Sequence, residues 1–323
     1  MKRVASGLLS IVAVLGCAGG ANAQAYPERP IRIVCPFPPG GSSDFGARIL
    51  AQYLPNLLKQ PVVIDNRGGA GGNIGTDIVA KASPDGYTLL ATSEGPITVS
   101  PSLYPRLPYS PARDLSAVTQ YIKYTHVVVV SPTVKVSSIK ELIALAKAQG
   151  GKLSYSHPGV GTSNHLAVEQ FKLMTNTDII SVSYKGGGPA IVSVIGNETQ
   201  VSFATAPSAI PHVKSGKLKA IAVTAGKRSS VLPDLPTIAE SGVPGYAIEG
   251  WVGLLTPAKV PAAIVARLYD ETVRIMKMKE VNDLVFSSGS EVAYTAPKET
   301  QALLREEGAM WATVIRKLGI KGE

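Results

Sequence analysis

The sequence predicts an α/β protein of two lobes joined by two crossing strands. Apolar runs of strand length alternate with helical stretches along most of the chain, a pattern typical of mostly parallel sheets covered by helices. The chain has 323 residues, and a length of about 300 residues usually exceeds what one hydrophobic core serves. Two apolar runs far apart in the sequence, 126–130 and 251–255, are placed to cross between the lobes. We therefore expect a clamshell with these two crossing strands as its hinge.

Residues 1–23 have the features of an export signal. Two basic residues near the start precede an apolar run at 8–15, and the small residues Ala-Asn-Ala end at Ala23 as a cleavage signature. We expect cleavage before Gln24, and we favour it over lipidation of Cys17, because the residue two positions before that cysteine fits a lipoprotein signal poorly. No later run approaches the about 20 apolar residues that a membrane helix needs.

The first structural unit after this signal joins a buried strand to a helix start that suits an anion. Residues 31–35 form the strand, and three prolines between 36 and 39 stop it. Gly40 and Gly41 free the backbone, Ser42 or Ser43 can cap, and apolar residues follow at helical spacing. The unpaired N–H groups and the helix dipole there favour a carboxylate or phosphate. Many such turns bind nothing, and local sequence leaves that alternative open.

The remaining elements divide between the two lobes. The first lobe is expected to contain 24–127 and 250–323, and the second lobe 128–249. Further strands are predicted at residues 87–90, 126–130, 153–156, 180–184, 201–204, 218–224 and 251–255.

The second lobe repeats the anion-binding turn twice. Residues 158–164 follow a strand, and either Thr162 or Ser163 can cap the next helix. In residues 184–189 three glycines permit close backbone approach, and Pro189 suits a first helical turn. The glycine-rich residues 68–75 are expected to pack a loop against the cleft.

Seven segments in a fixed order carry a resemblance to a known family. They are YPERPIRIVCPFPPGGSSDFGAR (26–48), IDNRGGAGGNIG (64–75), SPDGYTLL (83–90), YKGGGPA (184–190), GKLKAIAVT (216–224), LPDLPTIAESGVPGY (232–246) and WVGLLTPAKVP (251–261). Together they resemble the periplasmic substrate-binding receptors of tripartite tricarboxylate transporters, the Bug or TctC type. The resemblance extends from residue 26 to the last helix.

This resemblance implies a two-lobed periplasmic binding protein of the type II-like clamshell class. It would capture a small organic carboxylate in the cleft, as a monomer and without a cofactor, and pass it to membrane transporter subunits. In the family, the loops matching 37–44 and 159–165 hold the ligand carboxylate from opposite lobes. The candidate ligand-binding residues are Phe37, Pro39, Gly40, Gly41, Ser42, Asp44, Gly159, Gly161, Thr162, Ser163, His165, Gly186, Gly187, Ala204 and Thr205. Asp44 and His165 could instead cap helices or pack.

One position departs from the family pattern. Many relatives carry an acid after the strand that here reads VSFATAPSA, where this chain has Ala204 and Thr205. An acid there could bind a ligand ammonium or hydroxyl group. Its absence favours a carboxylate with an apolar or neutral remainder over an amino acid, and leaves dicarboxylates, hydroxy acids and aromatic acids open.

Enzymatic, metal and nucleic-acid functions find little support in the sequence. It contains no G-x-S-x-G elbow and no P-loop, its four histidines lack metal-ligand spacing, and the Ser163/His165 pair has no acid beside it. Cys35 would be the single cysteine of the mature chain. The net charge of +9 falls to +7 when the two basic residues of the acid-free segment 1–23 are removed, and the remaining basic residues are scattered, which suits anionic small molecules.

Two alternatives remain open at this point. A ligand sensor that docks on a signalling receptor would have the same fold. A hydrolase or isomerase built on a binding-protein scaffold would turn its bound carboxylate over.

Overall fold

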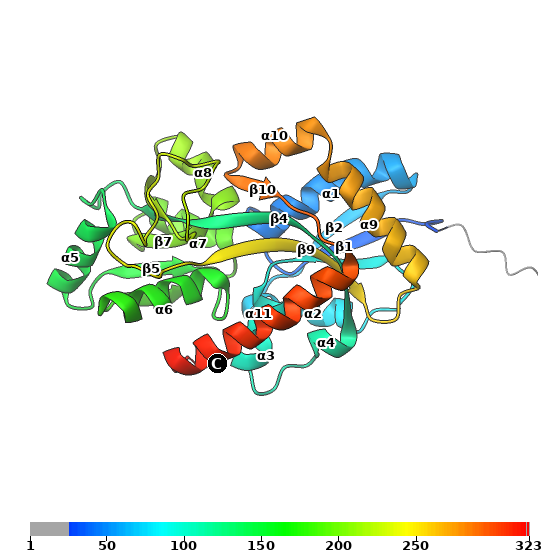
Figure 1. Cartoon of the computed structure of the whole chain (residues 1–323), viewed down its shortest axis with the longest axis horizontal. Helices are drawn as coiled ribbons and strands as arrows, with labels where there is room; N and C mark the ends of the chain where they lie inside the picture. The colour runs from blue at the N-terminus through cyan, green and yellow to red at the C-terminus, as the bar shows by residue number, and fades with distance from the viewer. Residues whose placement is uncertain (1–25, 321, 323) are drawn as a thin grey trace, which may run out of the picture.

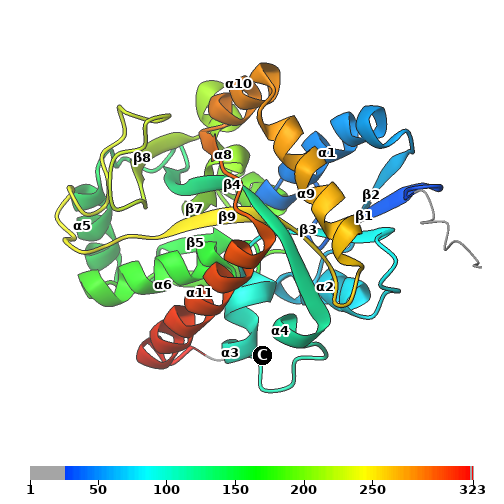
Figure 2. The same ribbon diagram turned by 45° about the vertical axis from the view of Figure 1, so that its right-hand side comes forward.

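The computed structural model describes residues 26–320 and 322, and it shows two α/β lobes with a continuous sheet running through both (Figures 1 and 2). The strands are β1 Ile31–Cys35, β2 Val62–Asn66, β3 Thr88–Thr92, β4 Leu115–Val130, β5 Ser154–His157, β6 Ile180–Ser183, β7 Val201–Thr205, β8 Lys219–Val223, β9 Glu249–Pro257 and β10 Ser290–Val292. Their order is β2-β1-β3-β9-β4-β7-β5-β6, and β8 and β10 also pair with β4.

Helices cover both lobes. They are α1 Ser42–Leu58, α2 Asn73–Ala80, α3 Ser100–Leu103, α4 Pro111–Asp114, α5 Ile139–Gln149, α6 Ser163–Thr175, α7 Gly187–Ile195, α8 Ala206–Lys214, α9 Ala262–Met276, α10 Lys279–Ser287 and α11 Pro297–Leu318, with a 3₁₀ turn η1 at Ala70–Gly72 and a π-helical turn η2 at Gly95–Val99. Within the described part of the chain, none of these helices has the length and apolar character to cross a membrane.

The crossing strands β4 and β9 give the sheet its mixed character. They pair antiparallel from Leu115 opposite Pro257 to Thr125 opposite Glu249. From His126 onward β4 pairs instead with β7 and β8 of the other lobe, also antiparallel. The described strands thus make four parallel and five antiparallel pairings, so the expectation of mostly parallel sheets is wrong, while the two-lobed α/β clamshell with two crossing strands is confirmed.

The predicted strand at 126–130 is only the last third of β4. The missed residues 115–125 mix apolar and polar side chains without regular alternation, and several of the polar ones are buried. Thr119 shows how such a side chain is tolerated, because its hydroxyl bonds backbone carbonyls of the same strand and of the segment before α11. Strands β2 and β10 also carried no separate prediction.

Each lobe has its own hydrophobic core, and α11 reaches from one to the other. The first core surrounds Ile33, Leu50 and Leu89, and the second surrounds Phe171 and Phe203. Trp311 and Ile315, near the end of α11, pack into the second core, and both views show α11 running below the crossing strands (Figures 1 and 2). The division at 127/128 and 249/250 stays a prediction. Residues 1–23 and the cleavage expectations lie outside the described residues.

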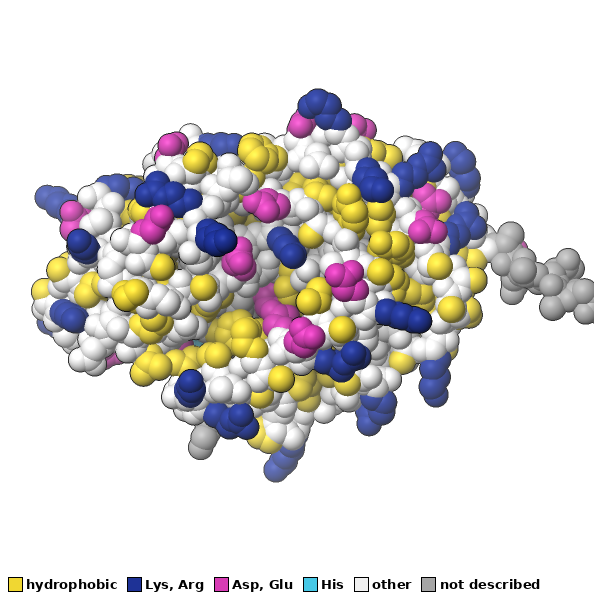
Figure 3. All heavy atoms as spheres, in the orientation of Figure 1, with side chains coloured by type: hydrophobic (Ala, Val, Ile, Leu, Met, Phe, Trp, Pro, Cys, Tyr) yellow, Lys and Arg dark blue, Asp and Glu magenta, His cyan; other side chains and the backbone are white. Residues whose placement is uncertain are grey.

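The visible face in Figure 3 shows Lys and Arg side chains scattered over both lobes, with acidic side chains between them. No large basic patch is formed on this face. The positive net charge is therefore a diffuse field and not a nucleic-acid footprint on this face.

Candidate functional site

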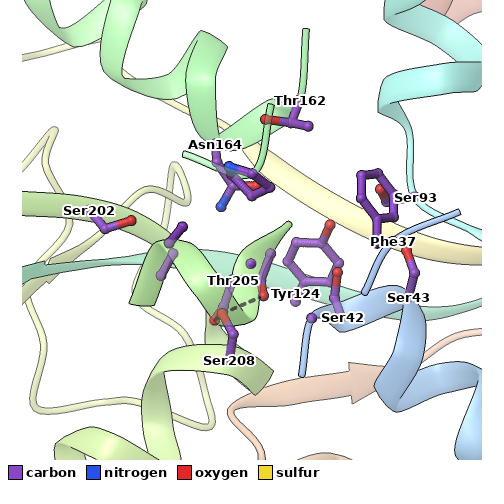
Figure 4. Close-up of a pocket in the computed structure, with 15 residues that line it drawn as sticks. Phe37, Ser42, Ser43, Ser93, Tyr124, Thr162, Asn164, Ser202, Thr205 and Ser208 are labelled. Carbon is purple, nitrogen blue, oxygen red and sulfur yellow. Dashed lines mark hydrogen bonds between the residues drawn. The ribbon is translucent and has the colours of Figure 1, made fainter. Parts of the chain in front are cut away.

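A pocket rich in hydroxyl groups lies between the lobes, at the carboxyl ends of strands β1, β3, β5 and β7 (Figure 4). This edge is where α/β sheets bind ligands, since several loops and helix starts converge there. The wall consists of Phe37, Gly41, Ser42, Ser43, Ser93, Tyr124, Pro158, Thr162, Asn164, Gly187, Ala190, Ser202, Ala204, Thr205 and Ser208. Among these described wall residues none carries a charged side chain, so recognition rests on hydroxyls, amides and the backbone.

The first lobe contributes the loop after β1 and the start of α1. The N-cap is Gly41, whose backbone is extended and which offers no side chain to the helix amides. The expectation that Ser42 or Ser43 caps the helix is therefore wrong, because both serines already lie in its first turn. The Ser43 hydroxyl is buried and has no hydrogen-bond partner among the described residues. The uncapped amides and this hydroxyl remain available to a ligand.

Asp44 supports this loop from behind and does not line the pocket. Its carboxylate accepts from the Gly40 amide at 3.1 Å, from Asn66 Nδ2 at 3.1 Å and from Arg48 Nε at 2.7 Å. Asn66 also donates to the Phe37 carbonyl oxygen at 2.8 Å. The carboxylate thus ties the glycine turn to β2.

The second lobe contributes the loop between β5 and α6. Thr162 is the N-cap: its hydroxyl donates to the Gly159 carbonyl oxygen at 2.7 Å and accepts from the His165 amide at 3.5 Å. Gly159 and Gly161 have φ values of +144° and +81°, which side chains rarely adopt. Asn164 lines the pocket and donates to the Phe203 carbonyl oxygen at 2.7 Å.

The two histidines beside this loop are neutral. Burial lowers the pKa of His157 to about 3 and that of His165 to about 4, so neither supplies a positive charge near neutral pH. Their rings pack together with centroids 4.6 Å apart, and His165 Nδ1 accepts from the Gly161 amide at 3.5 Å. His165 therefore shapes the loop from behind the wall.

Ser163 pairs with a histidine that the sequence did not suggest. Its Oγ lies 2.8 Å from His126 Nε2, in β4. Neither residue is part of the pocket wall. A serine nucleophile must face the reacting atom, so this pair reads as a structural contact below the pocket.

The loops after β6 and β7 complete the second wall. Helix α7 begins at Gly187 with Gly186 as N-cap, so Pro189 lies in the first helical turn as predicted. Helix α8 begins after Thr205, whose side chain does not cap the helix amides. Ser202, Thr205 and Ser208 lie at this end of the pocket (Figure 4), and Ala190 and Ala204 also line the pocket.

The predicted site residues divide into wall and support. Those that line the pocket are Phe37, Gly41, Ser42, Thr162, Gly187, Ala204 and Thr205. Those outside its lining are Pro39, Gly40, Asp44, Gly159, Gly161, Ser163, His165 and Gly186. Wall residues without a prediction are Ser43, Ser93, Tyr124, Pro158, Asn164, Ala190, Ser202 and Ser208. Several of these stand next to predicted positions. Ser93 follows the end of β3, which extends two residues beyond the predicted strand, and Tyr124 lies in the part of β4 that was not predicted.

Glycines allow the two lobes to touch through their backbones. A Cβ on Gly188 would lie 2.7 Å from the Pro39 carbonyl oxygen, and a Cβ on Gly71 would lie 2.6 Å from the Val160 carbonyl oxygen. Both distances are shorter than real side chains show. Gly71 belongs to the glycine-rich segment 68–75, which thus packs against the loop of the other lobe. The structure is therefore a closed form of the clamshell.

A buried carboxyl group lies beneath the pocket. Glu94 accepts from the Tyr124 hydroxyl at 3.4 Å through both oxygens and from the Trp251 amide at 3.2 Å. Burial raises the pKa of Glu94, and this effect exceeds the opposite effect of the hydrogen bonds that the carboxyl group accepts. Glu307 of α11 accepts from Trp251 Nε1 at 2.8 Å, and burial together with the charge of Glu94 raises its pKa to about 7. The two carboxyl groups thus bracket one crossing strand.

The fold and the pocket define a bilobal solute-binding protein, and the comparisons identify its family. The chain belongs to the TctC family of periplasmic solute receptors: the model described as "Tripartite tricarboxylate transporter family receptor" matches residues 46–320. It is 36% identical to Protein BugT of Bordetella pertussis over 99% of both chains.

Solved structures agree with this assignment. R. palustris Rpa4515 with adipate is 32% identical, with a TM-score of 0.89 over 92% of this chain and 99% of that one. MatC from Rhodopseudomonas palustris with bound malate is 28% identical, with a TM-score of 0.85 over 90% of this chain and 100% of that one.

Proposed function

We propose that this protein captures a small organic carboxylate between its lobes and delivers it to the membrane subunits of a tripartite tricarboxylate-type transporter. Membership of the receptor family supports this function, and so do the carboxylates bound to two structurally similar proteins. The same family membership disfavours a hydrolase or isomerase on this scaffold. A signalling partner in place of a transporter would need the same pocket.

The observation that carries the proposal is the free Ser43 hydroxyl beside the uncapped start of α1. Both groups face the pocket from the first lobe, and the starts of α6 and α7 face it from the second lobe. Helix starts and hydroxyl groups stabilise a carboxylate by donating hydrogen bonds, without a cationic side chain. The wall carries no acidic side chain among its described residues, so nothing there repels an anion.

Closure would follow from ligand binding. A carboxylate that accepts hydrogen bonds from both lobes at once stabilises the closed form alone, since these donors meet only there. The backbone contacts of Gly188 and Gly71 support this view, because they permit the lobes to approach without side chains between them.

A thermal-shift screen of organic acids tests the function. A cognate acid at a hundredfold excess over Kd should stabilise the folded protein by about 2.7 kcal/mol. The methyl ester of the same acid should bind far more weakly, because a neutral ester offers little to the amide donors. A broad library that leaves the unfolding temperature of the empty protein unchanged would refute the proposal.

We further propose export to the periplasm and a monomeric state. The supporting signal is residues 1–23, with cleavage before Gln24. Intact-mass analysis of the protein from a periplasmic extract decides between this start and a lipidated chain that starts at Cys17. Light scattering of the purified protein measures its oligomeric state.

A further inference from the structure

The pocket presents different hydrogen-bonding groups at its two ends. Figure 4 shows Ser42, Ser43 and Ser93 toward one side and Ser202, Thr205 and Ser208 toward the other. All six side chains carry one hydroxyl group, so composition makes the two ends look alike. The position of each hydroxyl proton distinguishes them.

At the second end the hydroxyl protons are already used inside the protein. Ser208 Oγ donates to the Thr205 carbonyl oxygen at 2.8 Å, and a carbonyl can only accept. Ser208 Oγ must then be the acceptor in its 2.9 Å contact with Thr205 Oγ1. Ser202 Oγ likewise donates to the Ser156 carbonyl oxygen at 3.0 Å. Thr205 and Ser202 therefore present the lone pairs of their hydroxyl oxygens to a ligand, and they present no hydroxyl protons.

The start of α8 supplies no amide donor from its first two residues at this end. Pro207 has no N–H, and Ala206 is fully buried outside the pocket lining. A ligand group at this end thus meets the hydroxyl acceptors of Thr205 and Ser202.

Only some chemical groups can bind to the hydroxyl acceptors of Thr205 and Ser202. A carboxylate only accepts, so it would face the lone pairs of Thr205 and Ser202. An ammonium only donates, and the described wall holds no acidic side chain to neutralise it. A hydroxyl or a carboxamide both donates and accepts.

We propose that the ligand carries a neutral hydroxyl or carboxamide group opposite its carboxylate, and that Thr205 and Ser202 select this group by accepting its proton. The proposal rests on the proposed function, which places the ligand carboxylate at the first end. It makes Thr205 and Ser202 specificity-determining residues of the receptor.

Near-isosteric pairs of acids provide the test. Calorimetry at about pH 8, where both carboxyl groups of a diacid are ionised, compares succinamate with succinate and glutaramate with glutarate. The amino acids 4-aminobutanoate and 5-aminopentanoate serve as the cationic members. In the series that fits the pocket, the monoamide should bind at least about tenfold more tightly than its diacid, and the amino acid should bind more weakly than the monoamide.

Two substitutions should move this preference in opposite directions. Thr205→Val keeps the shape but removes the acceptor, so the monoamide loses its advantage. Ser208→Ala leaves the Thr205 proton free to donate, so the diacid gains relative to the monoamide. Ser215→Ala, an exposed hydroxyl at the other end of α8, should change neither affinity and serves as the control. The unfolding temperature of each empty variant reports its fold.

The outcomes separate the two proposals. Diacids that bind the natural protein as tightly as their monoamides overturn the selection by Thr205 and Ser202 while leaving carboxylate capture intact. If no acid of either series nor of the broad library binds, the proposed function itself fails and this inference falls with it. A Ser208→Ala variant with an unchanged preference would show that the hydroxyl protons do not control selection.

Discussion

The start of α1 and the junction of β7 with α8 form opposite walls of one pocket, yet their hydroxyl groups are bonded differently. Ser43, in the first turn of α1, has no partner among the described residues, whereas Thr205 and Ser208 at the junction bond each other at 2.9 Å. A hydroxyl without a protein partner, such as that of Ser43, is free to donate to the carboxylate that all ligands of the proposed class share. Internally paired hydroxyls present a fixed pattern, which can discriminate between ligands that differ at their far end.

The largest expected effect comes from Ser43→Ala. If this hydroxyl donates to the ligand carboxylate, its loss weakens binding by about 1.5–3 kcal/mol, the range for hydrogen bonds to charged groups. The stability of the empty protein should hold or rise, because an unpaired buried hydroxyl disappears. Calorimetry and thermal unfolding measure the two effects. Unchanged affinity would show that the Ser43 hydroxyl does not bind the ligand, so the proposed difference between the two walls would not hold.

The contact between the walls can be disturbed without touching the ligand. Gly188→Ala places a Cβ 2.7 Å from the Pro39 carbonyl oxygen, and overpacking of this kind costs about 1–3 kcal/mol. The open form lacks this contact and tolerates alanine in a helix, so only closure and ligand affinity should suffer. Gly196→Ala, at the far end of α7, meets only ordinary contacts and is the matched control. Equal affinities of the two variants would contradict a closure through backbone contacts.

Support of the first wall is tested by Asp44→Ala. The change removes the acceptor of the Gly40 amide and of Arg48, and loss of such a helix-start contact costs about 0.5–2 kcal/mol of folding stability. Affinity should change little, because the carboxylate lies outside the pocket wall. A fall in affinity with stability retained would place Asp44 in contact with the ligand or its waters.

A pH effect is expected from Glu94 and Glu307, the two carboxyl groups beneath the pocket. The pKa of Glu307 is raised to about 7 from its usual 4.5, so the folded protein binds more protons than the unfolded chain between these values. Folding stability should therefore fall as the pH rises from about 4.5 to about 7. The raised pKa of Glu94 acts in the same direction. Glu307→Gln should flatten the profile in denaturant titrations; an unaltered slope would contradict the assignment.

Local sequence was sufficient where backbone chemistry acts over a few residues. The strand at 31–35, its proline stop and the helix after Gly41 were predicted because proline, glycine and apolar spacing act within one turn of chain. The first turn of α7, which contains Pro189, follows from the same short-range effects, whereas the sequence left Thr162 and Ser163 open as the cap of α6 and the structure shows Thr162. The family resemblance extended this to two lobes and to the loops that face each other.

Tertiary structure alone decided which side chains form the wall. Tyr124 reaches the pocket because β4 continues back from the predicted 126–130 to Leu115 and pairs with β9 over that length. Ser43 faces the pocket while Asp44 turns away, and Ser202 gives its proton to Ser156 in the neighbouring strand. These features depend on strand register and on partners far away in the sequence, which no local pattern encodes. The sequence by itself thus determined the class of protein and the glycine-rich turns beside the pocket, whereas packing determined which side chains form the pocket wall.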